Sequence, residues 1–186
     1  MSYAIYKTEA IILRVIPSGE ASSDVVFFTR EFGKITTRVQ SARKIESKMR
    51  MHLTKYNHVV IDMVRGKNMW RLTGITTIDS TTVFHDHGLL HAWHRMVSLA
   101  EFLIRGEEIH EELFNFFVDI MHSSKISNTK ALELFGVIHV LDMLGYWHGE
   151  CLSRHPTEDV LEYCHHHTKK LIKMINESIE ATQIVV

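Results

Sequence analysis

The spacing of apolar residues changes near residue 80, and this change constrains the fold more than any other feature of the sequence. Before it lie five short runs rich in β-branched and aromatic residues, separated by turn residues. After it, apolar residues recur at steps of three and four, as on one face of a helix. The sequence therefore predicts an α+β chain, with a β-rich domain over residues 1–80 and an all-α helical domain over residues 81–186.

The five runs have the length and punctuation of a small closed sheet. We place the strands at about residues 10–16, 24–29, 34–40, 58–64 and 69–76. Arg65-Gly66-Lys67-Asn68 predicts a hairpin turn between the last two. The stretch 41–57 is long, basic and poor in β-formers, as the connection between the third and fourth strands of a five-stranded OB barrel is. The first domain is therefore predicted to be an OB-fold β-barrel.

Apolar stripes predict four helices in the second domain, at about residues 93–104, 109–120, 129–144 and from 157 onward. The third is apolar around most of its circumference, so we expect it at the centre of the bundle. Ser127 or Asn128 is its candidate N-cap, and Gly145 is suited to end it. The last helix is expected to turn these residues toward the core: Val160, Cys164, Leu171, Ile175 and Ile179.

The net charge of −1 conceals two domains of opposite charge. Residues 1–79 hold 13 Lys and Arg against 7 Asp and Glu, giving +6, whereas residues 80–186 hold 8 against 15, giving −7. Between residues 30 and 71 the excess reaches +8, enough to attract a polyanion. We predict that seven of these residues form a nucleic-acid-binding basic track: Arg30, Lys34, Arg38, Arg43, Lys44, Lys48 and Arg50. The competing interpretation is a solvated basic face.

Nucleic-acid strands on OB barrels also stack their bases on aromatic rings. The candidates here are Phe27, Phe28, Tyr56 and Trp70. Since neighbours on a strand face opposite sides, at most one of Phe27 and Phe28 can belong to the barrel core, and the other is available to a base or to the helical domain. The alternative for each ring is an ordinary place in the core.

A series of short motifs gives the chain a resemblance to the bacterial recombination mediator family RecO. The motifs occur in the family's order at Thr8–Arg14, Gly19-Glu20, Asp24, Phe28-Thr29, Gly33-Lys34, Arg38-Val39, Ala42-Arg43-Lys44 and Ser47-Lys48, with a second echo at Leu141–Tyr146. The resemblance implies a protein of the RecFOR pathway of recombinational repair. Such a protein binds single- and double-stranded DNA, anneals complementary strands, and helps to load recombinase onto DNA coated by single-strand-binding protein, without making or breaking a bond.

The resemblance also implies two protein partners, RecR and the acidic, apolar C-terminal tail of single-strand-binding protein, which docks on the helical domain. That domain is net acidic here, so an acidic peptide needs a local basic spot. Three lysines of the last helix are the candidate: Lys169, Lys170 and Lys173. An ordinary solvated helix face is the alternative.

Many members of the family place a four-cysteine zinc ribbon after the Leu-Gly-Tyr motif, and this chain does not. Its nearest substitute is the set Cys151, His155, Cys164 and His167, whose spacing does not suit a zinc knuckle. We therefore expect no cofactor, and zinc at these four residues is the alternative. A second metal hypothesis is a His-rich metal-dependent hydrolase, because His87, His91 and His94 share a helix face after His85. A generic OB-fold module for nucleic acid or protein is the third alternative.

No catalytic motif or targeting signal competes with a binding role. The sequence has no framed nucleophile, phosphate-cradling glycine loop or dinucleotide fingerprint, so we do not expect an enzyme. Its apolar runs are far shorter than the roughly 20 residues of a membrane span. With two cysteines, both near the C-terminus, no disulfide framework is indicated. We expect a cytoplasmic, nucleoid-associated protein.

Overall fold

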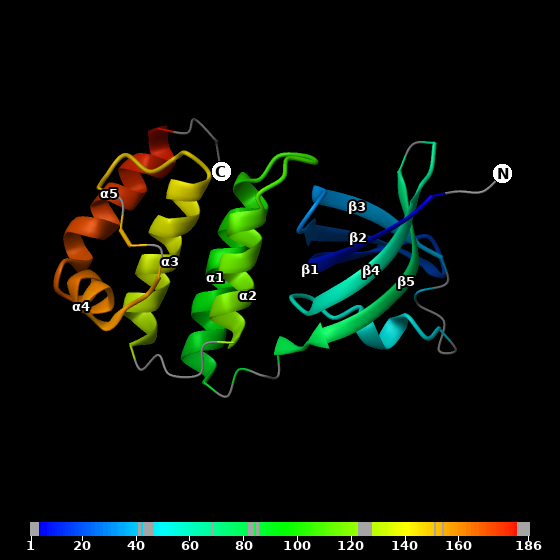
Figure 1. Ribbon diagram of the computed structural model, residues 1–186, viewed down its shortest axis with the longest axis horizontal. Helices are drawn as coiled ribbons and strands as arrows, with labels where there is room; N and C mark the ends of the chain where they lie inside the picture. The colour runs from blue at the N-terminus through cyan, green and yellow to red at the C-terminus, as the bar shows by residue number, and fades with distance from the viewer. Residues whose placement is uncertain are drawn as a thin grey trace. The chain divides into compact units, whose positions relative to one another are not determined.

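The computed structural model describes residues 4–40, 42, 47–67, 69–81, 84, 86–122, 128–150, 152, 153 and 155–181 (Figure 1). The chain forms two compact units, which we describe separately. The barrel unit consists of Met1–Val83 and Ile104–Val118, and the helical unit of Phe84–Leu103 and Asp119–Val186. Residues 104–118 therefore belong to the barrel unit, whereas a single boundary after residue 80 assigns them to the helical domain.

The strands of the barrel unit close into a barrel in the order β1-β2-β3-β5-β4 (Figure 1). Neighbouring strands are antiparallel except for β3 and β5, which are parallel. This is the architecture of the OB fold, so the predicted fold class is confirmed. The elements are β1 (Ile5–Ser18), β2 (Ser22–Thr29), β3 (Gly33–Val39), the short 3₁₀ helix η1 (Arg50–His52), β4 (His58–Arg65) and β5 (Trp70–Asp79).

Strand β1 is longer than its apolar pattern predicts, because it serves two neighbours. Its first half pairs with β4 and its second half with β2, with a register shift between Ile12 and Arg14. A bulge of this kind bends a strand and lets it turn the corner of a barrel. In β3 the alternation is regular: Ile35, Thr37 and Val39 are buried, while the residues between them are more exposed. The barrel core is formed by the inward set, which includes Ile12, Val25, Phe27, Ile61 and Met63.

Residues 104–118 complete the barrel unit from outside the strands. The N–H of Lys34 donates to the carbonyl oxygen of Gly106 at 3.0 Å. Gly33, with φ +65°, has no room for a side chain, since a Cβ there would lie 2.2 Å from the carbonyl oxygen of Glu108. Phe28 points away from the barrel core and packs on Phe114 of α2 (Glu111–His122), with ring centroids 5.7 Å apart. The segment therefore covers one side of the barrel with apolar contacts.

In the helical unit, α3 (Thr129–Met143) lies at the centre, as predicted, because it packs on α1 (His87–Leu103), α4 (Glu158–His166) and α5 (Thr168–Ala181). The Asn128 side chain caps α3 by accepting the N–H of Ala131 at 3.1 Å. Gly145 follows the helix with φ +76°, as a C-terminal glycine should. The alternative cap, Ser127, lies outside the described residues.

Two sequence predictions about the helices need correction. The single helix expected from Thr157 is two helices, α4 and α5, separated at His167. Its apolar positions keep a helical period across the break, so the pattern did not reveal it. The second helix, expected from residue 109, begins at Glu111, and Ile109 before it is 59% exposed. Among the described residues, no helix is long and apolar enough to cross a membrane.

Candidate nucleic-acid interface

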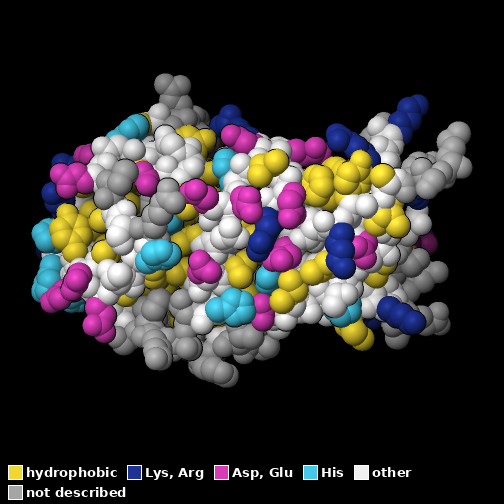
Figure 2. Space-filling view, viewed as in Figure 1, with side chains coloured by type: hydrophobic (Ala, Val, Ile, Leu, Met, Phe, Trp, Pro, Cys, Tyr) yellow, Lys and Arg dark blue, Asp and Glu magenta, His cyan; other side chains and the backbone are white. Residues whose placement is uncertain are grey.

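The described members of the predicted basic track lie in different settings. The Arg30 guanidinium pairs with Glu9 at 2.9 Å and lies over the ring of Phe114. Lys34 and Arg38 share the outer side of β3, and Lys48 and Arg50 are exposed beside and within η1. Arg43 and Lys44 lie outside the described residues. On the face drawn in Figure 2, the dark-blue side chains over the strands stand apart from one another rather than forming one band.

A more concentrated group of cations lies where β3 meets the turn between β4 and β5. Arg38 and Arg71 are register partners on the parallel strands β3 and β5. They line a hollow of about 420 Å³, and an adjoining hollow of about 360 Å³ shares both arginines. We call this surface the cationic groove; the larger hollow is lined by Arg38, Gln40, Val64, Arg65, Gly66, Lys67, Met69 and Arg71. Like charges on paired strands repel, so this arrangement favours an anion.

Carboxylates neutralise only part of the cationic groove. Arg38 forms two hydrogen bonds with Asp24, at 2.9 and 3.1 Å, and Arg65 is 3.7 Å from Glu107. Within the described part of the chain, Lys67 and Arg71 make no ion pair, and both side chains are exposed. Their positive charge is therefore available to an outside anion. The turn between β4 and β5 is also one of the loops with which OB folds bind oligonucleotides.

The hydrogen bond from Arg38 holds the pKa of Asp24 below its usual value. A carboxyl group with a lowered pKa stays ionised at neutral and mildly acid pH, and it releases its partner only when the pH falls below the usual pKa of aspartate. The pair is exposed, so it contributes little to folding stability. Its consequence is for binding, because Asp24 competes with any phosphate for Arg38.

Replacing Asp24 by Asn is therefore expected to tighten binding of the predicted nucleic-acid ligand by about threefold to tenfold at low salt, since one more cation then faces its phosphates. Fluorescence anisotropy with a labelled oligonucleotide measures the change. Glu180→Gln, at the exposed end of α5, makes the same change of net charge and serves as the control. An equal gain in both variants would mean that net charge, and not Arg38, is responsible.

The structure corrects the predicted base-stacking role of four aromatic residues. Phe27, Phe28, Tyr56 and Trp70 are all buried, with at most 6% of the residue exposed. Phe27 and Trp70 belong to the barrel core, and Phe28 packs on Phe114 and Phe117 of α2. Rings enclosed in this way have no free face for a base. The competing interpretation, an ordinary place in the core, is the one that the structure supports.

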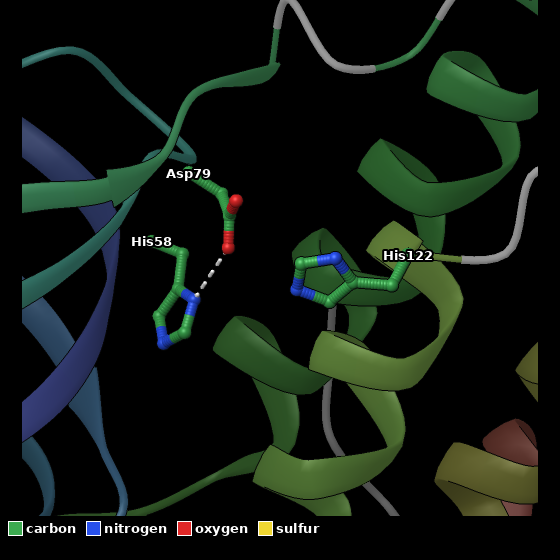
Figure 3. Close-up of side chains that lie close together, drawn as sticks. All are labelled: His58, Asp79 and His122. Carbon is green, nitrogen blue, oxygen red and sulfur yellow. Dashed lines mark hydrogen bonds and ion pairs between the residues drawn. The ribbon is translucent and has the colours of Figure 1, made fainter.

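A buried histidine of the barrel unit has a structural role. His58 Nδ1 lies 3.2 Å from Asp79 Oδ2, the contact drawn in Figure 3, and His58 Nε2 lies 3.1 Å from Glu9 Oε2. Both ring nitrogens of His58 are therefore engaged by carboxylates. The contacts join β4 to β5 and to β1 at one end of the barrel.

The two metal hypotheses find no geometric support among the described residues of the helical unit. Burial raises the pKa of the Cys164 thiol to about 11, because it disfavours the charged thiolate. His155 is exposed, and the His167 ring stacks on Tyr163 at 4.3 Å. His87, His91 and His94 lie on α1, yet no three described ligand groups of this unit converge. Cys151 and His85 lie outside the described residues.

The lysines proposed for a partner peptide are exposed on α5, and one of them lines a hollow. Lys170 borders a cavity of about 680 Å³ between α4, α5 and the segment after α3, together with Trp147, Tyr163 and Met174. Lys169 does not line it, and Lys173 pairs with Glu177 at 3.6 Å. The cavity offers aromatic rings beside the cation of Lys170, although Glu150 and Asp159 also line it.

Comparison with known proteins identifies the part of the chain that carries the cationic groove. A family model described as "Recombination protein O N terminal" matches residues 1–81, which include all five strands. The N-terminal domain belongs to the RecO family. The resemblance inferred from the motifs is thus confirmed, and every residue of the cationic groove lies inside the matched RecO region.

Curated relatives extend the similarity beyond the barrel. The chain is 30% identical over 145 residues to the DNA repair protein RecO of Dehalococcoides mccartyi, a match that covers 76% of this chain and 56% of that protein. Proteins of the same name from Heliobacterium modesticaldum and Roseiflexus sp. are each 26% identical over 144 residues, which cover 76% of this chain and 52% and 50% of theirs. The chain thus spans about half the length of these RecO proteins.

Sequence reasoning missed three of the four cations of the groove. Arg65, Lys67 and Arg71 were counted in the basic excess but were assigned only to a turn and a strand. A signal for them existed, because the predicted hairpin falls on an OB-fold loop that binds oligonucleotides. These residues are distant in sequence from the motif region around Arg38, so the sequence alone does not indicate that they meet it.

Proposed function

We propose that this chain binds DNA through the cationic groove and acts in recombinational repair. The observation that carries the proposal is the meeting of Arg38, Arg65, Lys67 and Arg71 on one concave surface, with two of the four cations free of carboxylates among the described residues. Phosphate contacts of this kind supply most of the affinity of sequence-independent binding and make it strongly salt-dependent. The relatives' common name, DNA repair protein RecO, supports the same role.

We further propose that the chain acts by bringing strands together rather than by chemistry. Neutralising the phosphates of two strands reduces their repulsion, which favours annealing. Because its N-terminal domain belongs to the RecO family, the chain would act as a mediator that works with RecR to load recombinase at gaps in DNA. This role would place the chain with the nucleoid in the cytoplasm. A generic OB-fold binding module is the alternative.

The proposed contact with single-strand-binding protein uses the cavity beside Lys170. An acidic, apolar peptide tail needs a hydrophobic pocket and a cation for its carboxylates, and the cavity offers Trp147, Leu171 and Met174 around that lysine. Asp159, which also lines the cavity, opposes an acidic ligand, so the contact is expected to be weak and to depend on salt. Lys170→Glu should abolish it.

Three measurements on the intact chain test these proposals. Fluorescence anisotropy with a labelled oligonucleotide over a salt series should give affinities that fall steeply as salt rises. An annealing assay with complementary strands separates a mediator from a generic binder, which would bind DNA without accelerating annealing. Binding of the synthetic tail peptide tests the cavity independently. Absence of DNA binding at low salt would refute the proposed function.

A further inference from the structure

Tyr6 is an exposed ring held in a fixed position at one end of the barrel. It lies on β1 in register with Met63, on the same side of the strand as Ala10 and Ile12, which point into the core. Its ring meets Phe32 and Trp70 edge to face, with centroids 5.7 and 5.4 Å apart and interplanar angles of 84° and 87°. Tyr6 is nevertheless 37% exposed, unlike the four aromatic residues corrected above.

The contacts of Trp70 connect this exposed ring to the cationic groove. The Arg65 guanidinium lies over the Trp70 indole, 5.2 Å from the ring centroid, and the Tyr6 ring meets the same indole edge to face. Arg65 lines the cationic groove, and its side chain is 67% exposed. An aromatic ring and a phosphate-binding cation are thus neighbours on the same small barrel, which is the combination that binds single strands.

Glu107 fixes the indole between them. Its carboxylate accepts a hydrogen bond from Trp70 Nε1 at 3.0 Å and lies 3.7 Å from Arg65. The ion pair is long and exposed, so a phosphate can replace Glu107 at Arg65 at little cost. The hydrogen bond to Trp70 can remain when this happens. The aromatic cluster is therefore ordered before DNA arrives, which lowers the entropy cost of binding.

We propose that Tyr6 stacks on an unpaired base of a strand whose phosphates lie in the cationic groove, so that the barrel prefers single-stranded to double-stranded DNA. The proposal rests on the proposed function, and it adds a physical reason for the barrel to prefer single-stranded over double-stranded DNA. Bases inside a duplex are already stacked and paired, and they reach a protein ring only if the duplex opens. The groove alone contacts phosphates and has no contact that recognises an unpaired base.

The wild-type protein itself provides the first test, with three probes of equal length: an oligothymidine strand, an abasic strand with the same phosphates, and a duplex. We expect the oligothymidine strand to bind about tenfold more tightly than the abasic strand at the same salt concentration, because stacking on one ring adds affinity only when bases are present. Equal affinities for these two strands would overturn the stacking proposal and leave the groove intact. Failure to bind all three would overturn the proposed function as well.

Variants then assign the effect to Tyr6. Tyr6→Leu is expected to lose about tenfold in affinity for oligothymidine and almost nothing for the abasic strand, while Tyr6→Phe keeps the wild-type preference. Phe102→Leu is the control, because Phe102 is an aromatic residue that is 44% exposed on α1 of the helical unit and lines neither proposed site. Equal loss on both strands in Tyr6→Leu would overturn the proposal, since it would mean that the ring only supports the barrel. Thermal unfolding of each variant identifies misfolding, and the wild-type comparison stands without any variant.

Discussion

Reversing two charges of the cationic groove, Lys67→Glu with Arg71→Glu, is expected to weaken DNA binding by about 100-fold at low salt. Both side chains are exposed and have no carboxylate partner among the described residues, so their replacement removes two phosphate contacts and adds repulsion. Fold stability should hardly change, because neither side chain packs in the core. Anisotropy with a labelled single strand measures the loss, and circular dichroism checks that the barrel is folded.

The control for this double variant carries the same change of charge in the helical unit. Lys130 on α3 and Lys169 on α5 are both exposed, and replacing both by Glu also lowers the net charge by four. We expect this control to bind DNA within about threefold of the wild type, since charges outside the site act only through a screened field. If the two double variants lost affinity equally, the position of the charges would not matter and the groove would not be the binding site.

Gly33→Ala is expected to destabilise the barrel unit by about 2 to 5 kcal/mol. A left-handed backbone conformation costs a residue with a Cβ about 1 to 2 kcal/mol, and overpacking adds about 1 to 3 kcal/mol. Both penalties apply here, because φ is +65° and the new Cβ would meet the backbone of Glu107 and Glu108 at 2.2 to 2.7 Å. Backbone atoms of a packed segment cannot move aside as a flexible side chain can.

Gly19→Ala separates the two penalties. Gly19 has nearly the same φ, +67°, but nothing lies within 4 Å of the position of its Cβ. We therefore expect a loss of only about 1 to 2 kcal/mol from the backbone conformation alone. Urea unfolding of both variants gives the comparison. Equal losses in the two variants would show that residues 104–108 do not pack against Gly33, and the contact of Glu107 with Trp70 would lose its support.

The barrel was predictable because its signals are local. Each strand shows its own apolar run or alternation, and the turn residues between the strands are close in sequence, so the five strands followed from short windows. The cap of α3 was predictable for the same reason, since Asn128 accepts a hydrogen bond from a residue three positions away. Local patterns of this kind do not depend on how distant segments meet.

The cationic groove was not predictable in the same way, because distant strands create it. Arg38 and Arg71 become neighbours only through the parallel pairing of β3 and β5. The burial of Phe28 depends likewise on Phe114 and Phe117, far along the chain. The alternation of side chains on β2 indicates that Phe27 and Phe28 face opposite sides of the strand. The outer ring then has two candidate partners, a base or the helical domain. The sequence pattern alone does not distinguish between these two partners.

The salt dependence of single-strand binding tests the central claim most directly, because its slope counts the phosphates that the protein neutralises. Lys67→Ala and Arg71→Ala should each reduce the slope of log K against log salt by about 0.7, whereas Lys55→Ala should leave it unchanged, because Lys55 lies over the ring of Tyr56 and does not line the groove. Slopes that stay at the wild-type value in both groove variants would contradict phosphate binding in the cationic groove.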